Sequence, residues 1–308
     1  MANKYRLVTR SDMDGLVCAV ILKQMDLIDE IIFVHPKDMQ DGKIEITSND
    51  IITNLPYYKQ AFLVFDHHDS ELKRNGEAEN YIIIPDAPSA ARVVYDYYGG
   101  AEKLPQISEL MMIAVDKADA AQFSVDEILH PDGWELLSFI MDSRTGLGRF
   151  REFTVSNYQL MMDLIDYCID HDIEDIMKLP DVVERTELYK SYEDKFRMQL
   201  EECSIMYNNL IVLDLRDEEI IYPGNRFIMY AVNPEINISI HALNGFKNQN
   251  TVFALGKSIV NRDSKTNIGE LCLKYGGGGH TAAGTCQIDN DKAEEVLKEL
   301  IEKINLDG

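Results

Sequence analysis

Apolar and polar positions along the first part of the chain alternate in the order strand, helix, strand. Apolar runs typical of buried strands occupy residues 5–9, 31–35, 61–65 and 81–84, and segments with helical periodicity occupy 16–27, 88–98 and 107–118. Strands that alternate with helices pair in parallel through right-handed crossovers. The pattern therefore predicts an α/β domain with a parallel sheet over residues 1–130.

The strand pattern is absent from residues 131–203 and returns afterwards. From Pro180 to Cys203, apolar side chains recur every three or four positions, which predicts one long helix within a helical linker. Shorter strands are predicted at 210–215, 236–242 and 251–258, and helices at 267–274 and 292–304. We expect residues 204–308 to form a second, smaller α/β domain.

Composition places the chain among ordinary globular proteins, with 308 residues of which 45% are hydrophobic. Its five cysteines are scattered and include no Cys-x-x-Cys pair, so neither a disulfide framework nor a zinc site fits their spacing. Lys4, Arg6 and Arg10 surround the first strand and Lys23 ends the next apolar run, which argues against a signal peptide or a membrane span. We expect a cytoplasmic protein without a membrane partner.

The formal net charge of −23 limits the choice of partner. Proteins that follow a long phosphate backbone carry a basic stripe, and none is visible here. A polyanionic substrate would therefore be short and held by metal ions and a few basic side chains. Solubility is an alternative explanation of the acidity, so the charge alone does not identify the substrate.

Acidic and imidazole side chains follow two of the predicted strands directly. Asp12 and Asp14 come after the strand at 5–9, and Asp66-His67-His68 closes the run at 61–65. Carboxylates outnumber imidazoles and thiolates are absent, which favours manganese or magnesium over zinc or copper. Because Asp12 and Asp14 are two residues apart, each can serve one ion of a pair, as in two-metal hydrolysis of phosphate esters or anhydrides.

The run Gly276–Gly279, followed by His280, is the second candidate site. Consecutive glycines can turn their N–H groups toward one anion, and a histidine adds a donor that can be charged. We predict an anion-binding nest, for which the competing interpretation is a flexible loop or hinge.

These motifs together resemble the DHH family of phosphoesterases with a C-terminal DHHA1 domain. The resemblance covers nearly the whole chain, through Asp12-Met13-Asp14-Gly15, Asp66-His67-His68 and the Gly276–His280 segment. The family includes RecJ-type exonucleases, nano-RNA and pAp phosphatases, cyclic-dinucleotide phosphodiesterases and family II pyrophosphatases. It implies a metal-binding catalytic domain at 1–130, a linker at 131–203 and a substrate-binding domain at 204–308.

The resemblance also implies roles for individual residues. Asp12 and Asp14 would bind two manganese ions, with magnesium as the alternative, and His67 and Asp116 would complete the second ion's shell. The family's bridging aspartate is assigned to Asp50, with Asp38 and Asp41 as alternatives. His68 would act as acid or electrostatic partner of the phosphoryl group, supported by Asp66. Gly277, Gly278, Gly279 and His280 would hold the rest of the substrate, with a basic residue, Arg262 first and Lys257 or Arg226 next, on a terminal phosphate.

One departure from the family pattern concerns the first metal. Many relatives have a histidine where this chain has Val8, and RecJ-like members have an aspartate where it has Ser11. The expected reaction is manganese-dependent hydrolysis of a phosphodiester or phosphomonoester in a small nucleotide or very short oligonucleotide. The alternatives are a polyphosphate or pyrophosphate hydrolase and a nucleotide-binding protein that has lost catalysis. A homodimer is left open.

Overall fold

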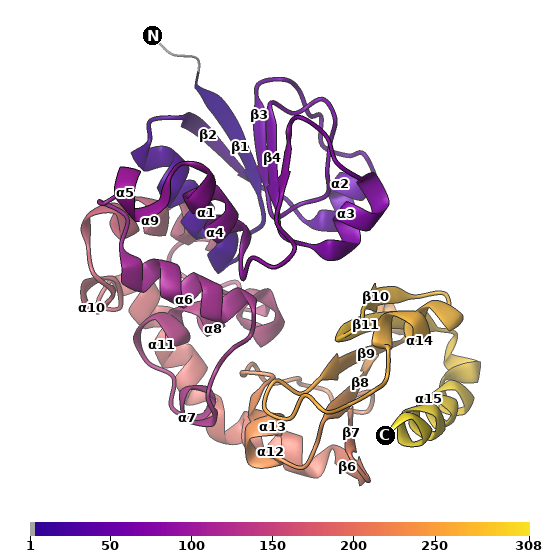
Figure 1. Ribbon diagram of the computed structural model, residues 1–308. Helices are drawn as coiled ribbons and strands as arrows, with labels where there is room; N and C mark the ends of the chain where they lie inside the picture. The colour runs from indigo at the N-terminus through magenta and orange to yellow at the C-terminus, as the bar shows by residue number, and fades with distance from the viewer. Residues whose placement is uncertain (1–3) are drawn as a thin grey trace. The chain divides into compact units, whose positions relative to one another are not determined.

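The computed structural model describes residues 4–308, which divide into two compact units (Figure 1). The first unit contains the chain up to Gln122 together with Pro131–Leu188. The second contains Phe123–His130 and Tyr189–Gly308. The region predicted as a linker is therefore shared between the two units. Within residues 4–308, no helix is both long and apolar enough to cross a bilayer.

A five-stranded parallel sheet forms the centre of the first unit, in the order β2-β1-β3-β4-β5. This confirms the predicted α/β class. All carboxyl ends of the strands lie along one edge of this sheet because the strands are parallel. The strand bounds are β1 Tyr5–Thr9, β2 Ile28–Phe33, β3 Asp50–Thr53, β4 Leu63–Asp66 and β5 Tyr81–Ile83.

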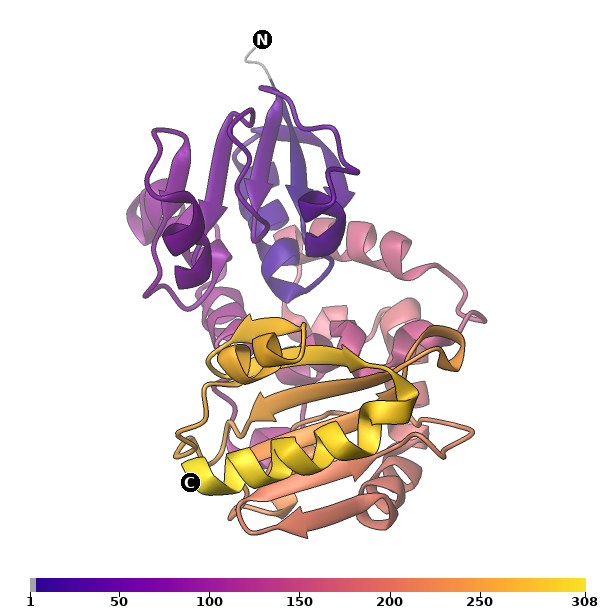
Figure 2. The same cartoon turned by 90° about the vertical axis from the view of Figure 1, so that its right-hand side faces the viewer.

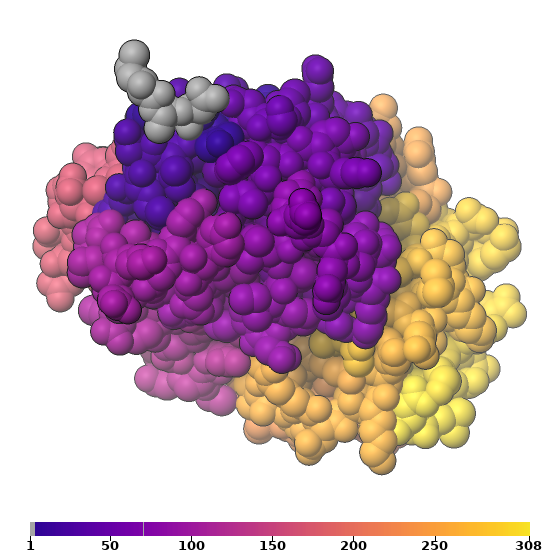
Figure 3. Space-filling view, turned by 45° about the horizontal axis from the view of Figure 1, so that its top comes forward, coloured from indigo at the N-terminus to yellow at the C-terminus, as the bar shows by residue number. Residues whose placement is uncertain are grey.

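Helices cover both faces of this sheet. Helix α1 (Met13–Gln24) is buried along most of its length and packs against α4 (Ala90–Tyr97), α6 (Glu109–Asp119) and α9 (Asn157–Asp170). Figure 1 shows α2 (Pro36–Gln40) and α3 (Asp69–Asn75) on the opposite side of the strands, where Met39 joins Val8 and Ile52 in a hydrophobic cluster. The space-filling view shows the indigo and purple N-terminal residues as one continuous mass (Figure 3). The unit also contains α5 Gly100–Lys103, α8 Gly133–Met141, α10 Ile173–Ile176 and most of α11 Pro180–Ser191.

The second unit is built on a six-stranded sheet in the order β10-β11-β9-β8-β7-β6, antiparallel except between β7 and β8. Helices α14 (Ile268–Lys274) and α15 (Ala293–Asp307) cover one face, as Figure 2 shows, over a core that includes Ile240 and Phe253. On the other face, Tyr230 of α13 (Ile228–Val232) is hydrogen-bonded to Ser239 of β8 at 2.6 Å. The remaining bounds are β6 Ser204–Tyr207, β7 Leu210–Asp214, β8 Ile238–Asn244, β9 Thr251–Lys257, β10 Gly278–His280, β11 Ala283–Ile288 and α7 Val125–Leu129.

Two predicted elements differ from the structure. The long helix expected from Pro180 to Cys203 is divided at Tyr192 into α11 and α12 (Glu193–Glu202). Apolar periodicity does not show where the helical hydrogen-bond pattern is interrupted, so the sequence did not predict this division. The glycine run, predicted as an anion-binding nest with a flexible loop as the competing interpretation, is partly a strand, since Gly278–His280 is β10 and pairs with β11. Glycine has a low strand propensity, so neighbouring strand β11 must supply the order that the run lacks by itself.

Candidate metal centre

Asp12 and Asp14 lie where β1 gives way to α1. Asp12 is the N-cap of the helix, and its Oδ1 accepts the N–H of Gly15 at 3.0 Å. Asp14 is in the first turn, is 1% exposed, and accepts the N–H groups of Ala90 at 3.1 Å and Ala91 at 2.7 Å. These two donors belong to the first turn of α4, where unpaired N–H groups favour a negative charge. The Asp14 carboxylate is therefore held in one orientation by two helices.

Asp66 orients the histidine pair that follows β4. Its buried carboxylate accepts the His67 N–H at 2.8 Å, and its Oδ1 lies 2.7 Å from Nδ1 of His68. The other carboxylate oxygen accepts the hydroxyl of Tyr81 at 3.1 Å. Asp66 therefore holds the backbone of His67 and the ring of His68 in place.

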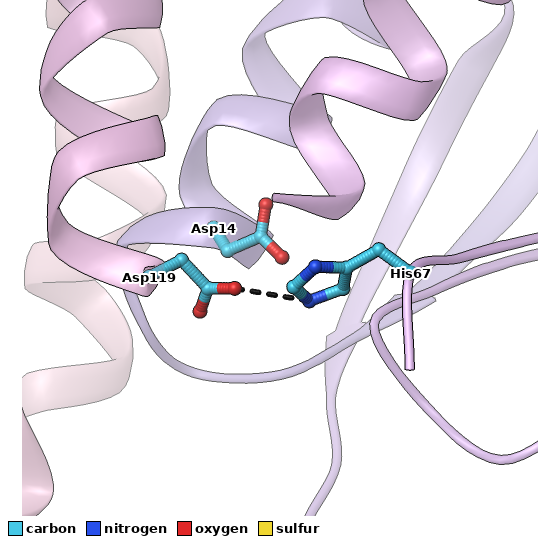
Figure 4. A group of neighbouring side chains, drawn as sticks. All are labelled: Asp14, His67 and Asp119. Atoms are coloured by element: carbon cyan, nitrogen blue, oxygen red, sulfur yellow. Dashed lines mark ion pairs between the residues drawn. The ribbon is translucent and has the colours of Figure 1, made fainter. Parts of the chain in front are cut away.

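His67 presents its second ring nitrogen to an acidic cluster. Nδ1 lies 3.1 Å from the carbonyl oxygen of Ala87, which can only accept, so Nδ1 carries a proton. Nε2 lies 3.0 Å from Oδ2 of Asp119 (Figure 4) but is buried without a hydrogen bond of acceptable geometry within the described residues. A buried ring nitrogen that faces a carboxylate in this way has the arrangement of a metal ligand.

Asp14, His67 and Asp119 converge on one point, and their ligand atoms all lie within 4.8 Å of one another. Burial, followed by the charges of Asp119 and Asp12, raises the pKa of Asp14 well above its usual range. Burial lowers the pKa of His67, but the ion pair with Asp119 and the charge of Asp14 raise it more, to about 9. The cluster thus favours a positive charge among its carboxylates, and its oxygen and imidazole donors suit Mn²⁺ or Mg²⁺.

Asp116, the predicted ligand from α6, does not reach this cluster. Its carboxylate accepts Arg92 Nε at 2.9 Å, Arg92 Nη2 at 2.6 Å and the Ser89 hydroxyl at 2.7 Å. Asp119, three residues later on the same helix, is the residue that meets His67. Residues three apart on a helix point in neighbouring directions, so the sequence could not decide between the two aspartates.

Asp50 lies at the other end of the sheet. It begins β3, is 1% exposed, and binds Arg6 through contacts of 2.6 and 3.0 Å. Because Asp12 and Asp66 follow the carboxyl ends of their strands, Asp50 cannot bridge ions held there. The alternatives Asp38 and Asp41 pair with a lysine beside α2, at 2.7 and 3.4 Å from Lys43.

Asn54 is a residue that sequence reasoning missed. It follows β3 directly, between the strands that lead to Asp12 and Asp66, and has a positive φ of 54°. It is 2% exposed, and neither Oδ1 nor Nδ2 has a hydrogen-bond partner within residues 4–308. A buried amide without partners costs about 1–3 kcal/mol, which indicates a ligand at this position. Its place at a strand end, like that of Asp66, was the available signal.

Val8 and Ser11, the two positions that depart from the family pattern, differ in burial. Val8 is fully buried in the cluster with Met39 and Ile52, so it contributes to the core and not to the metal centre. Ser11 is exposed in the turn that leads to Asp12.

The structure also shows where the predicted substrate-binding residues of the second unit lie. The N–H groups of Gly276 and Gly277 donate to Leu273 and Cys272 and cap α14, so the four glycine N–H groups do not converge as a nest. Gly278, Gly279 and His280 are exposed on β10. Arg262 lies in an exposed loop, and Lys257 donates to the Ser264 carbonyl at 2.8 Å. The guanidinium carbon of Arg226 lies 4.2 Å from the centre of the Phe227 ring.

Comparison with known proteins identifies the family. No family model and no curated protein matches the chain. A solved structure described as the pGpG-specific phosphodiesterase PggH from Vibrio cholerae is 60% identical, with a TM-score of 0.87, over 99% of this chain and 100% of the other. The chain is a member of the DHH phosphoesterase family.

Two more distant structures share the fold of this DHH phosphoesterase. An exopolyphosphatase-related protein from Bacteroides fragilis is 15% identical, with a TM-score of 0.54 over 98% of this chain and 92% of the other. RecJ from Thermus thermophilus with Mg²⁺ is 13% identical, with a TM-score of 0.51 over 98% of this chain and 50% of RecJ. As a DHH-family member, the protein is a hydrolase that acts on phosphate esters.

Proposed function

We propose that this DHH phosphoesterase hydrolyses the internal phosphodiester bond of a linear dinucleotide of the pGpG class. Water adds to the phosphorus, the bond to the 3′-oxygen breaks, and two nucleoside 5′-monophosphates leave. The observation that carries the proposal is the 60% identity, over 99% of the chain, to a phosphodiesterase described as pGpG-specific. The free cysteines and the nucleotide substrate fit a cytoplasmic enzyme.

The first unit supplies the groups for two divalent ions, which we propose to be Mn²⁺, with Mg²⁺ as the alternative. Asp14, His67 and Asp119 would hold one ion, since their ligand atoms already converge. Asp12 would serve the second, and the Asn54 amide, at the neighbouring strand end, would be a neutral ligand in place of a bridging carboxylate. Bound ions of this kind polarise the phosphoryl oxygen and lower the pKa of a coordinated water.

His68 is the candidate proton donor to the leaving 3′-oxygen. The buried carboxylate of Asp66 fixes the orientation of the His68 ring by the 2.7 Å contact at Nδ1. The side chain of His68 is 31% exposed, so a substrate can approach it. In the second unit, His280 and Arg262 remain the proposed contacts of the rest of the substrate.

Hydrolysis by the purified full-length protein tests the proposal. The panel contains pGpG, pApA, pAp, cyclic di-GMP and short polyphosphate, each with Mn²⁺ or Mg²⁺, and release of nucleotide and phosphate is measured. We expect GMP from pGpG at the highest kcat/KM, and loss of turnover in Asp119→Asn. Phosphate release from polyphosphate alone would establish the exopolyphosphatase alternative, and tight binding without turnover would establish the non-catalytic one.

A further inference from the structure

A pocket of about 280 Å³ opens within the first unit beside the candidate metal centre. It lies past the carboxyl ends of β1 and β2, and its wall includes Asp12, Phe33, Asp142, Arg144 and Met161. Open α/β sheets bind ligands in the crevice outside the carboxyl ends of their strands. Because Asp12 is part of the wall, a ligand in this pocket would adjoin the proposed metal ions.

The pocket is cationic in a protein that is strongly acidic overall. Three arginines, Arg10, Arg144 and Arg185, face two aspartates, Asp12 and Asp142, whereas the whole chain has a net charge of −23. Each of these arginines has a partner within the protein. Arg185 is 1% exposed and bonded to Asn157 and to backbone carbonyls, and Arg10 Nε lies 3.1 Å from Asp12 Oδ2. Arg144 is the most exposed of the three, with 59% of its side chain accessible against 38% for Arg10, and it is the candidate for contact with a ligand.

Arg144 is presented by a fixed turn. It belongs to the short 3₁₀ segment Ser143–Thr145, where the Thr145 hydroxyl donates to the Phe139 carbonyl at 2.6 Å. Its Nε donates to both carboxylate oxygens of Asp142, at 2.8 and 2.9 Å, and its side chain is 59% exposed. Holding the guanidinium through Nε leaves its planar terminal Nη groups to meet two adjacent acceptors, which is the geometry that arginine uses in bidentate recognition.

The rest of the wall suits a flat aromatic ligand. Phe33 is half-buried at the end of β2, and Val34, Leu160 and Met161 extend the apolar surface. Aromatic side chains stack on nucleobases without preference for sequence, whereas arginine discriminates among bases through guanine O6 and N7.

We propose that this pocket is the subsite for one guanine base of the substrate, stacked on Phe33 and read at O6 and N7 by Arg144. The proposal rests on the dinucleotide hydrolysis proposed above and assigns its base specificity. Adenine presents an amino donor where guanine presents O6, so it would oppose the Arg144 donors. Arg144 is thus a specificity residue and Phe33 a general stacking residue.

Kinetics with two dinucleotides test the assignment. We expect Arg144→Met to lower kcat/KM for pGpG by about 5- to 150-fold while changing that for pApA less than about 3-fold. Arg144→Lys keeps the positive charge but not the pair of parallel N–H donors, so it should recover only part of the lost kcat/KM for pGpG. Phe33→Leu should lower kcat/KM for pGpG and for pApA by the same factor. The control Arg151→Met removes an equal charge from an exposed loop outside the pocket and should change neither. An equal fall in kcat/KM for the two dinucleotides in Arg144→Met, or no fall, would overturn the proposal.

Binding of mononucleotides tests the guanine subsite independently of the proposed hydrolysis of dinucleotides. The Kd of 5′-GMP and of 5′-AMP is measured by calorimetry with Mg²⁺ for the wild type, Arg144→Met and Arg151→Met. We expect tighter binding of GMP, with the preference lost only in Arg144→Met. If the wild type hydrolyses no dinucleotide but keeps this preference, the reaction is wrong and the base subsite stands. Equal binding of GMP and AMP, or binding of neither, would refute the subsite.

Discussion

The two aspartates of helix α6 provide the sharpest test of the metal centre. Asp116→Asn and Asp119→Asn remove the same charge from positions three residues apart, but the structure gives the two carboxylates different partners. Asp119 meets His67, 3.0 Å away, in the candidate cluster, whereas Asp116 is bonded to Arg92 and Ser89. We therefore expect the first substitution to change stability and the second to change metal binding.

The expected magnitudes follow from these contacts. Asp116 makes two charge-assisted hydrogen bonds with Arg92, and the two side chains are 18% and 25% exposed. Partial exposure reduces the cost of breaking such a pair to about 1–2 kcal/mol. That cost corresponds to a fall in Tm of about 2–8 °C. Loss of a ligand in Asp119→Asn should weaken Mn²⁺ binding by at least about 100-fold, since removal of supporting residues alone costs about 10- to 100-fold.

Two measurements on metal-free protein distinguish these outcomes. Thermal unfolding in EDTA should show a lower Tm for Asp116→Asn, and calorimetric titration with Mn²⁺ should show weakened binding for Asp119→Asn. Saturating Mn²⁺ should raise the Tm of the wild type and of Asp116→Asn by mass action, with a much smaller rise for Asp119→Asn. Loss of Mn²⁺ binding in Asp116→Asn, with normal binding in Asp119→Asn, would refute the assignment.

Three other predictions concern separate parts of the molecule. Asn54→Asp, which adds a carboxylate at the buried strand end, should tighten Mn²⁺ binding about 10-fold in the same titration and destabilise the metal-free protein; unchanged affinity would exclude Asn54 from the centre. Burial, then a nearby arginine, lowers the pKa of His241 from 6.5 to about 4, so the folded state binds fewer protons than the unfolded state between these values. The free energy of unfolding should therefore decrease as the pH is lowered, by about 2 kcal/mol between pH 7.5 and pH 5. In urea unfolding, His241→Gln should lack this pH-dependent loss of stability. Gly277→Ala should cost at least about 2 kcal/mol because its Cβ would lie 2.1 Å from the Thr285 carbonyl oxygen, whereas Gly278→Ala, with open space around it, should change stability by less than about 0.5 kcal/mol; equal costs in urea unfolding would contradict this account.

The sequence predicted the elements of the first unit well because its signals are local. The apolar run before Asp66 is strand β4, and the segment that contains Asp116 is helix α6. The interruption at Tyr192 and the strand at Gly278–His280 were not predicted, and the strand depends on its pairing with β11.

The sequence by itself determined the fold class, the family and the class of reaction, hydrolysis of phosphate esters. Asp12 and Asp14 lie just after β1, where α1 begins, and the Asp66-His67-His68 motif begins at the last residue of β4. Parallel pairing of the strands brings these strand ends to one edge. Only the tertiary structure decided which further residues join them. Asp119 is proposed as a ligand instead of Asp116, and Asn54 instead of Asp50, because of side-chain direction and of which end of an element faces the site. Residue spacing is a one-dimensional quantity that does not contain that information, since each aspartate satisfies the pattern until its neighbours in space are known.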